Sequence, residues 1–202
     1  MVVAAAAARA GRAPNHVTRP INVFNLDSTH FTGSEFGDDK MNAEGLREYV
    51  HRILGHGAFT HFFICPGAQV TLCDTKTMSP SWWRTGEPGV PLNDHMRRNY
   101  MMFTNGVDTI QVEIDAIRAH GVSPWLSMRM NDNHNANEPK AWLHSKFWVE
   151  HPEYRKQGGF NYSIPAVQDY HFAFIEECWH ATTWTGSSAI GCAGRFRRIR
   201  RR

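Results

Sequence analysis

The stretch over residues 122–134 constrains the fold more than any other part of the chain. It begins as an apolar run over residues 122–130, whose side chains suit both faces of a buried strand and whose length is short for a helix. It ends in a polar group that gathers within six positions: Arg129, Asn131, Asp132 and His134. Parallel α/β folds place their functional groups beyond the carboxyl ends of such strands. The stretch therefore predicts a central strand that leads into a functional site. A polar loop in which Asn and Asp side chains make turn hydrogen bonds would have the same sequence.

The rest of the chain alternates between short apolar runs and amphipathic segments. The expected elements are a strand over 21–27, a helix over 42–54, a strand over 60–65, helices over 93–103 and 108–120, the strand over 122–130 and a helix over 165–177. Because the connections are too long for hairpins, the strands should be parallel and joined by right-handed crossovers. A complete (β/α)8 barrel needs about 250 residues, and the chain has 202. We therefore predict an α/β fold, a partial (β/α)8 TIM barrel of three N-terminal βα units with disordered termini.

Composition divides the chain into three segments: a disordered leader over residues 1–20, the barrel part over 21–177 and a tail over 178–202. The leader holds a five-alanine run without a preceding basic region, so it does not predict a signal peptide, and the cytoplasm is the favoured location. No apolar stretch is long enough to span a bilayer. The four cysteines lack both CxxC spacing and the density of a disulfide scaffold, so we expect buried free thiols.

The tail over residues 178–202 loses apolar periodicity and becomes rich in arginine. It holds six of the 22 basic residues and none of the 19 acidic ones, so the remainder carries a formal charge of −3. A body of that charge gives no support for nucleic-acid binding. One interpretation is a nucleic-acid or targeting tail. The interpretation that we favour is a frameshift near codon 178, which leaves the tail out of frame and unstructured. Synonymous codons in the shifted frame are compatible with a helix end, a turn and a carboxylate-ended strand.

Three motifs carry a resemblance to a known family. Residues 125–134 read Trp-Leu-Ser-Met-Arg-Met-Asn-Asp-Asn-His, residues 145–148 read Ser-Lys-Phe-Trp, and residues 151–154 read His-Pro-Glu-Tyr. Together they resemble bacterial glycoside-hydrolase-like TIM-barrel proteins, the group described as family 10 glycosyl hydrolase-like, over residues 21–177. The resemblance implies hydrolysis of glycosidic bonds by two carboxylates, one of them at the end of a fourth strand. Because the sequence as given holds no such strand, the catalytic residues stay unassigned and we expect a truncated, inactive hydrolase.

The same resemblance implies a carbohydrate or glycoside substrate at the mouth of the barrel. Arg129 would donate two hydrogen bonds to sugar hydroxyls or to a carboxylate, or would pair with Asp132. Asp27 and His30, at the end of the first strand, would face the same mouth, and Trp148 would stack on a sugar face. The full set of expected substrate-binding residues is Arg129, Asn131, Asp132, His134, Asp27, His30 and Trp148. No metal and no cofactor is expected.

Two other functions stay open on the sequence alone. A metal-dependent barrel hydrolase or isomerase would use Asp27, His30, Asp132 and His134 as oxygen and imidazole ligands, although no HxH or HExxH spacing supports it. A carbohydrate-binding remnant without catalysis would need only the sugar-binding half of the mouth. Three parallel strands without a closing partner leave two open edges. We therefore expect self-association through those edges, and we expect neither nucleic-acid nor membrane partners.

Overall fold

The computed structural model describes residues 20–27, 30–130, 132–181 and 191–192. Its elements, in chain order, are β1 (Val23–Leu26), the 3-10 helix η1 (Asp38–Lys40), α1 (Ala43–Gly55), β2 (His61–Ile64), α2 (Asp94–Thr104), α3 (Thr109–Ala119), β3 (Ser123–Met128), α4 (Lys146–Glu150), the 3-10 helix η2 (Pro152–Tyr154), β4 (Arg155–Lys156), β5 (Gly159–Phe160), α5 (Pro165–Ala181) and β6 (Gly191–Cys192). The predicted leader and most of the predicted tail lie outside the described residues. None of the described helices combines the length and the hydropathy that a membrane span requires.

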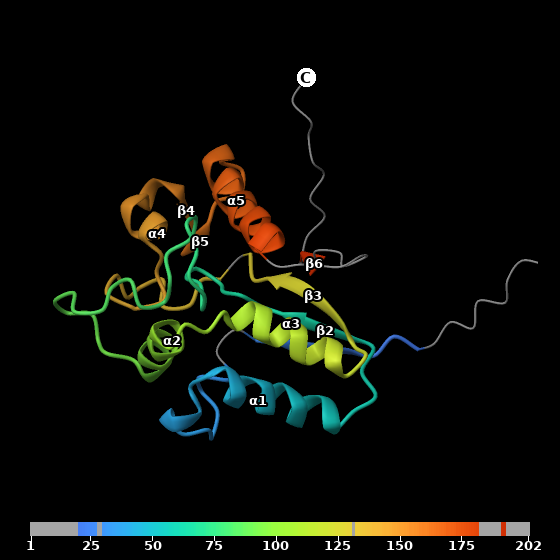
Figure 1. The fold of residues 1–202 in the computed structure, drawn as a ribbon. Helices are drawn as coiled ribbons and strands as arrows, with labels where there is room; N and C mark the ends of the chain where they lie inside the picture. Colours follow the sequence, from blue (N-terminus) through green and yellow to red (C-terminus); the bar gives the residue numbers. More distant parts are fainter. Residues whose placement is uncertain (1–19, 28–29, 131, 182–190, 193–202) are drawn as a thin grey trace, which may run out of the picture.

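The central sheet has the strand order β1-β2-β3-β6, and every pair of neighbours is parallel. Spatial order thus follows chain order, with α1 joining β1 to β2 and α3 leading into β3 (Figure 1). Helices α1 and α3 pack against each other along one face of the sheet. The predicted α/β class and the parallel pairing are confirmed. Within the described residues the sheet stays open, so no closed barrel is observed.

The helices begin where the sequence provides capping residues. The side-chain oxygen of Asn42 accepts hydrogen bonds from the first turn of α1, Asn93 does so for α2, and Asp108 does so for α3. Gly121, with a φ of 69°, directly follows the C-cap of α3, a position that favours glycine. The predicted boundaries of these three helices are confirmed to within one residue at each end.

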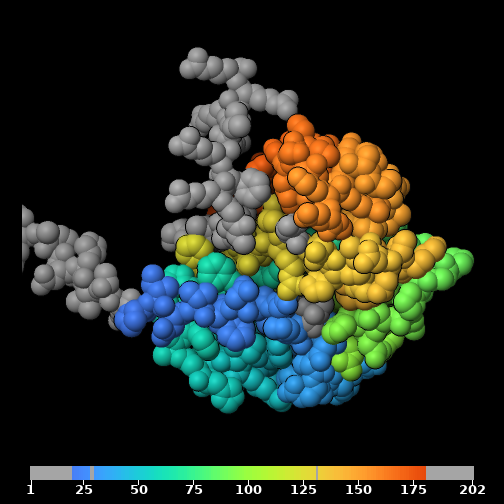
Figure 2. Space-filling model, turned by 180° about the vertical axis from the view of Figure 1, so that it is seen from behind, coloured from blue at the N-terminus to red at the C-terminus, as the bar shows by residue number. Residues whose placement is uncertain are grey.

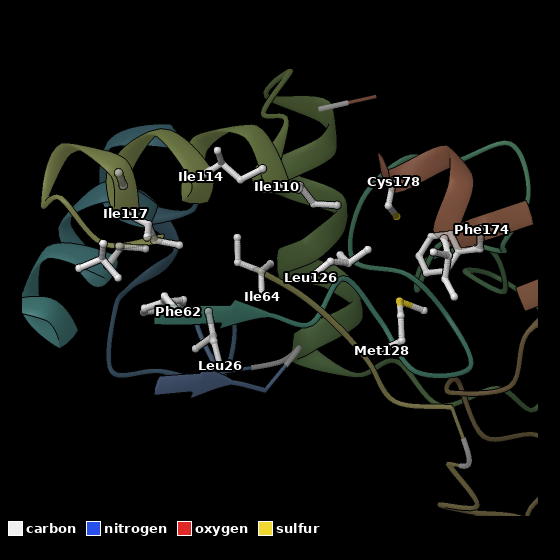
Figure 3. Close-up of a cluster of buried hydrophobic side chains, with 14 of the residues drawn as sticks. Leu26, Phe62, Ile64, Ile110, Ile114, Ile117, Leu126, Met128, Phe174 and Cys178 are labelled. Atoms are coloured by element: carbon white, nitrogen blue, oxygen red, sulfur yellow. The ribbon is translucent and has the colours of Figure 1, made fainter. Parts of the chain in front are cut away.

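The main core forms where one face of the sheet meets α3 (Figure 3). Phe62 and Ile64 of β2 and Leu126 of β3 point toward a row of isoleucines on the helix. The row consists of Ile110, Ile114 and Ile117. Their spacing of four and three residues places them on one face of α3, so the helix and the sheet bury their apolar surfaces against each other.

Strand β3 is buried on one face only, which corrects the expectation of a strand buried on both faces. Leu126 and Met128 face the core, whereas Ser127 between them and Trp125 directly before them are half-buried. Among the latter, Trp125 contacts the rings of His61 and Phe63 on β2, with centroids 5.3 Å and 5.6 Å apart. The sheet therefore alternates between a buried face and a half-exposed one, as open sheets do. The outer edge of β1 has no partner among the described strands, and self-association stays a prediction.

Helix α5 begins at Pro165 as predicted but extends past the predicted end at Glu177. Cys178, which the sequence pattern assigns to the tail, is 2% exposed and packs in the main core with Phe174 (Figure 3). The two-residue strand β6 pairs with the end of β3. The expectation of an unstructured tail is therefore wrong for these parts, because the four-residue spacing of Phe174 and Cys178 continues the buried face of the helix. The rest of the tail, and with it the frameshift, lies outside the described residues.

The segment over residues 133–160 forms a compact unit beside the sheet. It contains α4, η2 and the small antiparallel pair β4–β5, and it lies next to α5 (Figure 1). Trp148 from α4, Phe160 from β5 and Val167 from α5 form a second core. Apolar contacts between these three elements therefore hold the unit together.

We predict that Gly45→Ala lowers the free energy of unfolding by about 1–3 kcal/mol, because a methyl group there would collide with the carbonyl oxygen of Lys40. A loss of stability would be the opposite of the usual effect, since alanine normally stabilises a helix interior relative to glycine by about 1 kcal/mol. Urea denaturation of both proteins measures the difference. Gly55→Ala is the matched control in the same helix, where the added methyl group meets nothing. Its stability should equal or exceed that of the wild type, and equal losses in both variants would contradict the close approach at Gly45.

Candidate functional site

Arg129 lies at the centre of a charged cluster at the carboxyl edge of the sheet. Its Nη2 donates a hydrogen bond to Oδ2 of Asp27, which follows β1. Its Nη1 lies 3.8 Å from Oδ2 of Asp132. Figure 2 shows the segment of β1 in blue and the segment after β3 in yellow side by side on one face. The structure therefore brings three of the predicted residues together from two strand ends.

The charge of Arg129 is balanced by the two carboxylates. Burial acts to lower the pKa of Arg129, but Asp27 and Asp132 outweigh this effect and the pKa is raised. The side chains of Arg129 and Asp27 are 38% and 33% exposed, so solvent reaches their ion pair. The side chain of Asp132 is only 3% exposed, and a buried carboxylate depends on its partners for stability.

His134 joins the cluster through Asp132. Its backbone N–H donates to Oδ1 of Asp132 at 2.9 Å, and its ring Nδ1 lies against the same oxygen. The side chain of His134 is 66% exposed. Asp132 thus makes the local turn bond that a polar loop would make, and it also connects Arg129 to an imidazole that faces solvent.

Two residues that carried no sequence signal hold the loop of Asp132 in place. Gln69 Nε2 donates to the carbonyl oxygen of Asp132 at 2.9 Å, and Gln69 Oε1 lies 3.0 Å from Nδ1 of His144. His144 is fully buried, and burial lowers its pKa. Gln69 lies shortly after β2, and this position could have indicated a role at the carboxyl edge of the sheet. His144 lies 75 residues further along the chain, and no local sequence pattern marks it as part of this site.

Trp148 does not take part in the site, which corrects the expectation that it stacks on a sugar. It is 1% exposed. The ring of His144 stacks on it at a centroid distance of 3.6 Å, and the guanidinium of Arg155 lies 3.3 Å from its ring centroid. Two groups so close to one ring must occupy its opposite faces. No face of this indole is left for a ligand.

The two remaining predicted residues are His30 and Asn131. His30 is exposed, and its backbone N–H donates to the carbonyl oxygen of Asp27 at 3.3 Å. Within the described residues its ring forms no hydrogen bond or ion pair with Arg129 or Asp132, so His30 is not part of the observed cluster. Asn131 lies outside the described residues.

Searches against protein-family models and against curated proteins find no match to this chain. Any assignment of function therefore depends on the geometry and the chemistry of the cluster. In the part of the chain that the structure describes, no three His, Cys, Asp or Glu residues are grouped so that they could hold a metal ion.

A small cavity adjoins the cluster at Asp27. Its volume is about 30 Å³, and it lies at the carboxyl ends of β1 and β2, beneath helices α1, α2 and α3. Asp27 and Cys65 line it from the strands, and Asn99 and Glu113 line it from α2 and α3. Burial raises the pKa of Glu113 to about 8. The sequence gives no hint of this acid, because it stands beside the apolar face of a helix with ordinary amphipathic spacing.

A larger cavity, of about 260 Å³, is separate from the charged cluster. It lies beside Trp82 and Phe103, and none of the cluster residues lines it. Its carboxylate Glu177 already accepts hydrogen bonds from the backbone N–H groups of Lys76 and Thr77, at 2.7 Å and 3.0 Å. That carboxylate therefore has a structural role, since it ties α5 to the loop after β2.

Replacing Glu113 by glutamine should flatten the pH dependence of stability between about pH 4.5 and about pH 8. The carboxyl group of Glu113 stays protonated in the folded protein up to about pH 8 but ionises near its ordinary pKa of 4.5 when unfolded. Unfolding therefore releases a proton in this range, and stability falls as the pH rises. Glutamine removes that contribution. Urea midpoints of both proteins across the range measure the difference.

The control for this experiment is Asp115→Asn on the same helix, because Asp115 is exposed and its carboxylate accepts a hydrogen bond from Gln111 in its own helix. It should keep the wild-type pH profile. The lowered pKa values of His144 and His171 act in the opposite direction, but they act equally in all three proteins and cancel in the comparison. Parallel profiles for wild type and Glu113→Gln would contradict the assignment of a protonated Glu113.

Proposed function

We propose that this chain binds carbohydrate at the carboxyl edge of its sheet, through Asp27, Arg129, Asp132 and His134. The observation that carries the proposal is Arg129, which bridges carboxylates from two strand ends while its side chain remains 38% exposed. Sites of parallel α/β folds lie at this edge. The cluster thus stands where the fold class would place a ligand.

The chemistry of the cluster suits sugar hydroxyls. A hydroxyl group donates one hydrogen bond and accepts others, so it fits between a carboxylate and a guanidinium. Arg129 presents donors beside the acceptor oxygens of Asp27, and the exposed ring of His134 adds a further polar group at the rim. Adjacent hydroxyls of one sugar could therefore bond to neighbouring members of the cluster.

We also propose that the chain is the amino-terminal part of a glycoside-hydrolase-like (β/α)8 barrel. Two features support this proposal: consecutive strands are spatial neighbours in parallel, and α1 and α3 cover the same face of the sheet. In a closed barrel the other face would be interior, and here that face carries Phe63 and Trp125 half-exposed.

The proposed activity is binding without hydrolysis. A glycosidase needs one carboxyl group that protonates the leaving oxygen and a second that attacks the sugar or activates water. At the described strand ends, Asp27 and Asp132 both bind Arg129 instead. Release of sugar from any glycoside by the purified chain would contradict this part of the proposal.

We predict that Arg129→Met weakens the binding of sugars at least tenfold, which corresponds to about 1.4 kcal/mol. The substitution keeps an unbranched apolar stem but removes every donor of the guanidinium. Saturation-transfer NMR with a panel of methyl glycosides identifies the ligands, and titration gives the affinities. His134→Ala should also weaken binding. The backbone N–H of residue 134 still donates to the buried carboxylate of Asp132 in this variant, so an unchanged melting temperature separates lost binding from lost folding.

The matched control is Arg97→Met on α2. Arg97 is likewise paired with carboxylates, at 2.6 Å from Asp38 and 3.2 Å from Asp94, but it is not part of the cluster. Its removal should leave sugar binding unchanged. If no methyl glycoside binds the wild type, or if both arginine variants lose binding equally, the proposed site is wrong.

A further inference from the structure

The small cavity beside Asp27 contains polar groups that the charged cluster does not use. Its volume of about 30 Å³ offers room for about two water-sized groups. The polar side chains in its wall come from the end of β1, the loop after it, α2 and α3: Asp27, Thr32, Asn99, Thr109 and Glu113. Apolar side chains such as Leu26 and Ile110 form the rest of the wall. The cavity therefore suits a small ligand that has both an apolar part and a polar group.

Asn99 is the group that points most directly to an occupant. It is 2% exposed, and its Nδ2 has no hydrogen-bond partner within the described residues. A buried donor without a partner destabilises a fold, so folded proteins almost always satisfy such groups. Because Asn99 lines the cavity, a ligand atom that accepts a hydrogen bond there would satisfy it.

The carboxyl group of Glu113 is the second polar group that an occupant of the cavity could contact. Burial raises the pKa of this carboxyl group to about 8, which favours the protonated form at neutral pH. A protonated carboxyl group has both an O–H donor and a carbonyl acceptor. An occupant that accepts from Asn99 and donates to Glu113 must therefore carry a hydrogen that it can donate and a lone pair. A hydroxyl group has both.

The charges around the cavity exclude most other occupants. Among the described residues no lysine or arginine lines it, and the negative charge of Asp27 is already paired with Arg129, so an anion would find no counter-charge there. A cation would face the amide donor of Asn99. In the described residues no group of three His, Cys, Asp or Glu could hold a metal ion. A neutral hydroxyl on a short carbon arm fits both the polar pair and the apolar wall.

We propose that this cavity binds a hydroxymethyl group, between Asn99 and Glu113, and that in a carbohydrate this is the exocyclic hydroxymethyl of a sugar held at Arg129. The sugar part of this statement rests on the proposed function. The cavity itself does not, because any ligand with a hydroxyl on one carbon would fill it. Asp27 connects the two sites, since it lines the cavity and pairs with Arg129.

Methanol is the probe that tests the cavity by itself, since it is a hydroxyl group on one carbon. In the wild type, a methanol titration followed by NMR should shift the side-chain amide resonances of Asn99 along a saturating curve. Half-saturation is expected on the order of tens of millimolar or weaker, as suits a ligand of two heavy atoms. Linear shifts without saturation would mean that water alone fills the cavity, and this result would overturn the proposal.

Asn99→Leu gives the discriminating result because leucine keeps the branched arrangement of the side-chain heavy atoms and lacks the unpaired donor. We expect this variant to melt at the wild-type temperature or above it, and to lose the saturable response of the surrounding resonances to methanol. A variant that melts lower and still binds methanol would show that Asn99 is structural, which overturns the proposal. Asn105→Leu is the matched control, since the amide of Asn105 donates to the carbonyl oxygen of Met41 at 3.0 Å. It should bind methanol as the wild type does.

A comparison of sugars with and without the exocyclic hydroxyl group tests this inference separately from the proposed function. Methyl glucoside, methyl galactoside and methyl mannoside are each compared with the corresponding 6-deoxy sugar, which lacks only the exocyclic hydroxyl. For a glycoside that binds the wild type, the 6-deoxy form should bind at least tenfold more weakly, and Asn99→Leu should abolish that difference. Equal affinities within every pair would overturn the assignment of the sugar's hydroxymethyl. Saturable methanol binding without any sugar binding would refute the proposed function and retain the cavity as a hydroxymethyl site.

Discussion

The burial of one face of the parallel sheet against α1 and α3 determines where every polar feature of this protein lies. In the observed register, Leu26, Ile64 and Leu126 stand side by side across β1, β2 and β3, and all three are buried. A slip of one residue in any strand would turn its apolar side chains away from the helices. The register that fills the core therefore also brings the ends of β1 and β3 to the same edge, within reach of the long side chain of Arg129.

Asp132 is the residue on which the cluster depends. Its carboxylate is almost fully buried. Removing one partner of a buried ion pair costs far more stability than the intact pair contributes, because the other charge is left buried without compensation. Arg129 and His134 approach that carboxylate, while Gln69 holds the backbone carbonyl of the same residue. Contacts from the segments after β2 and β3 thus converge on one position. This convergence fixes the exposed Arg129 and His134 relative to each other, which a binding site requires.

The sequence predicts the parts of this structure that depend on local periodicity. Four helices, three strands and the charged strand end were predictable, because side-chain spacing and caps such as Asn42 act over a few residues. The role of Trp148 was not predictable, because its environment is built by His144 and Arg155 across a fold that local patterns do not describe. The same holds for Glu113, whose raised pKa arises from burial that only the tertiary packing creates.

The places where the fold departs from full satisfaction of its groups are informative, since natural proteins keep such departures mainly at functional sites. The unpaired amide of Asn99 is one of them within the described residues. Asp27, which follows β1, connects this amide to the charged cluster, because it pairs with Arg129 and lines the cavity of Asn99. A ligand at this carboxylate could therefore reach both Arg129 and Asn99. A single binding event could then give the amide of Asn99 the hydrogen-bond partner that it lacks within the described residues.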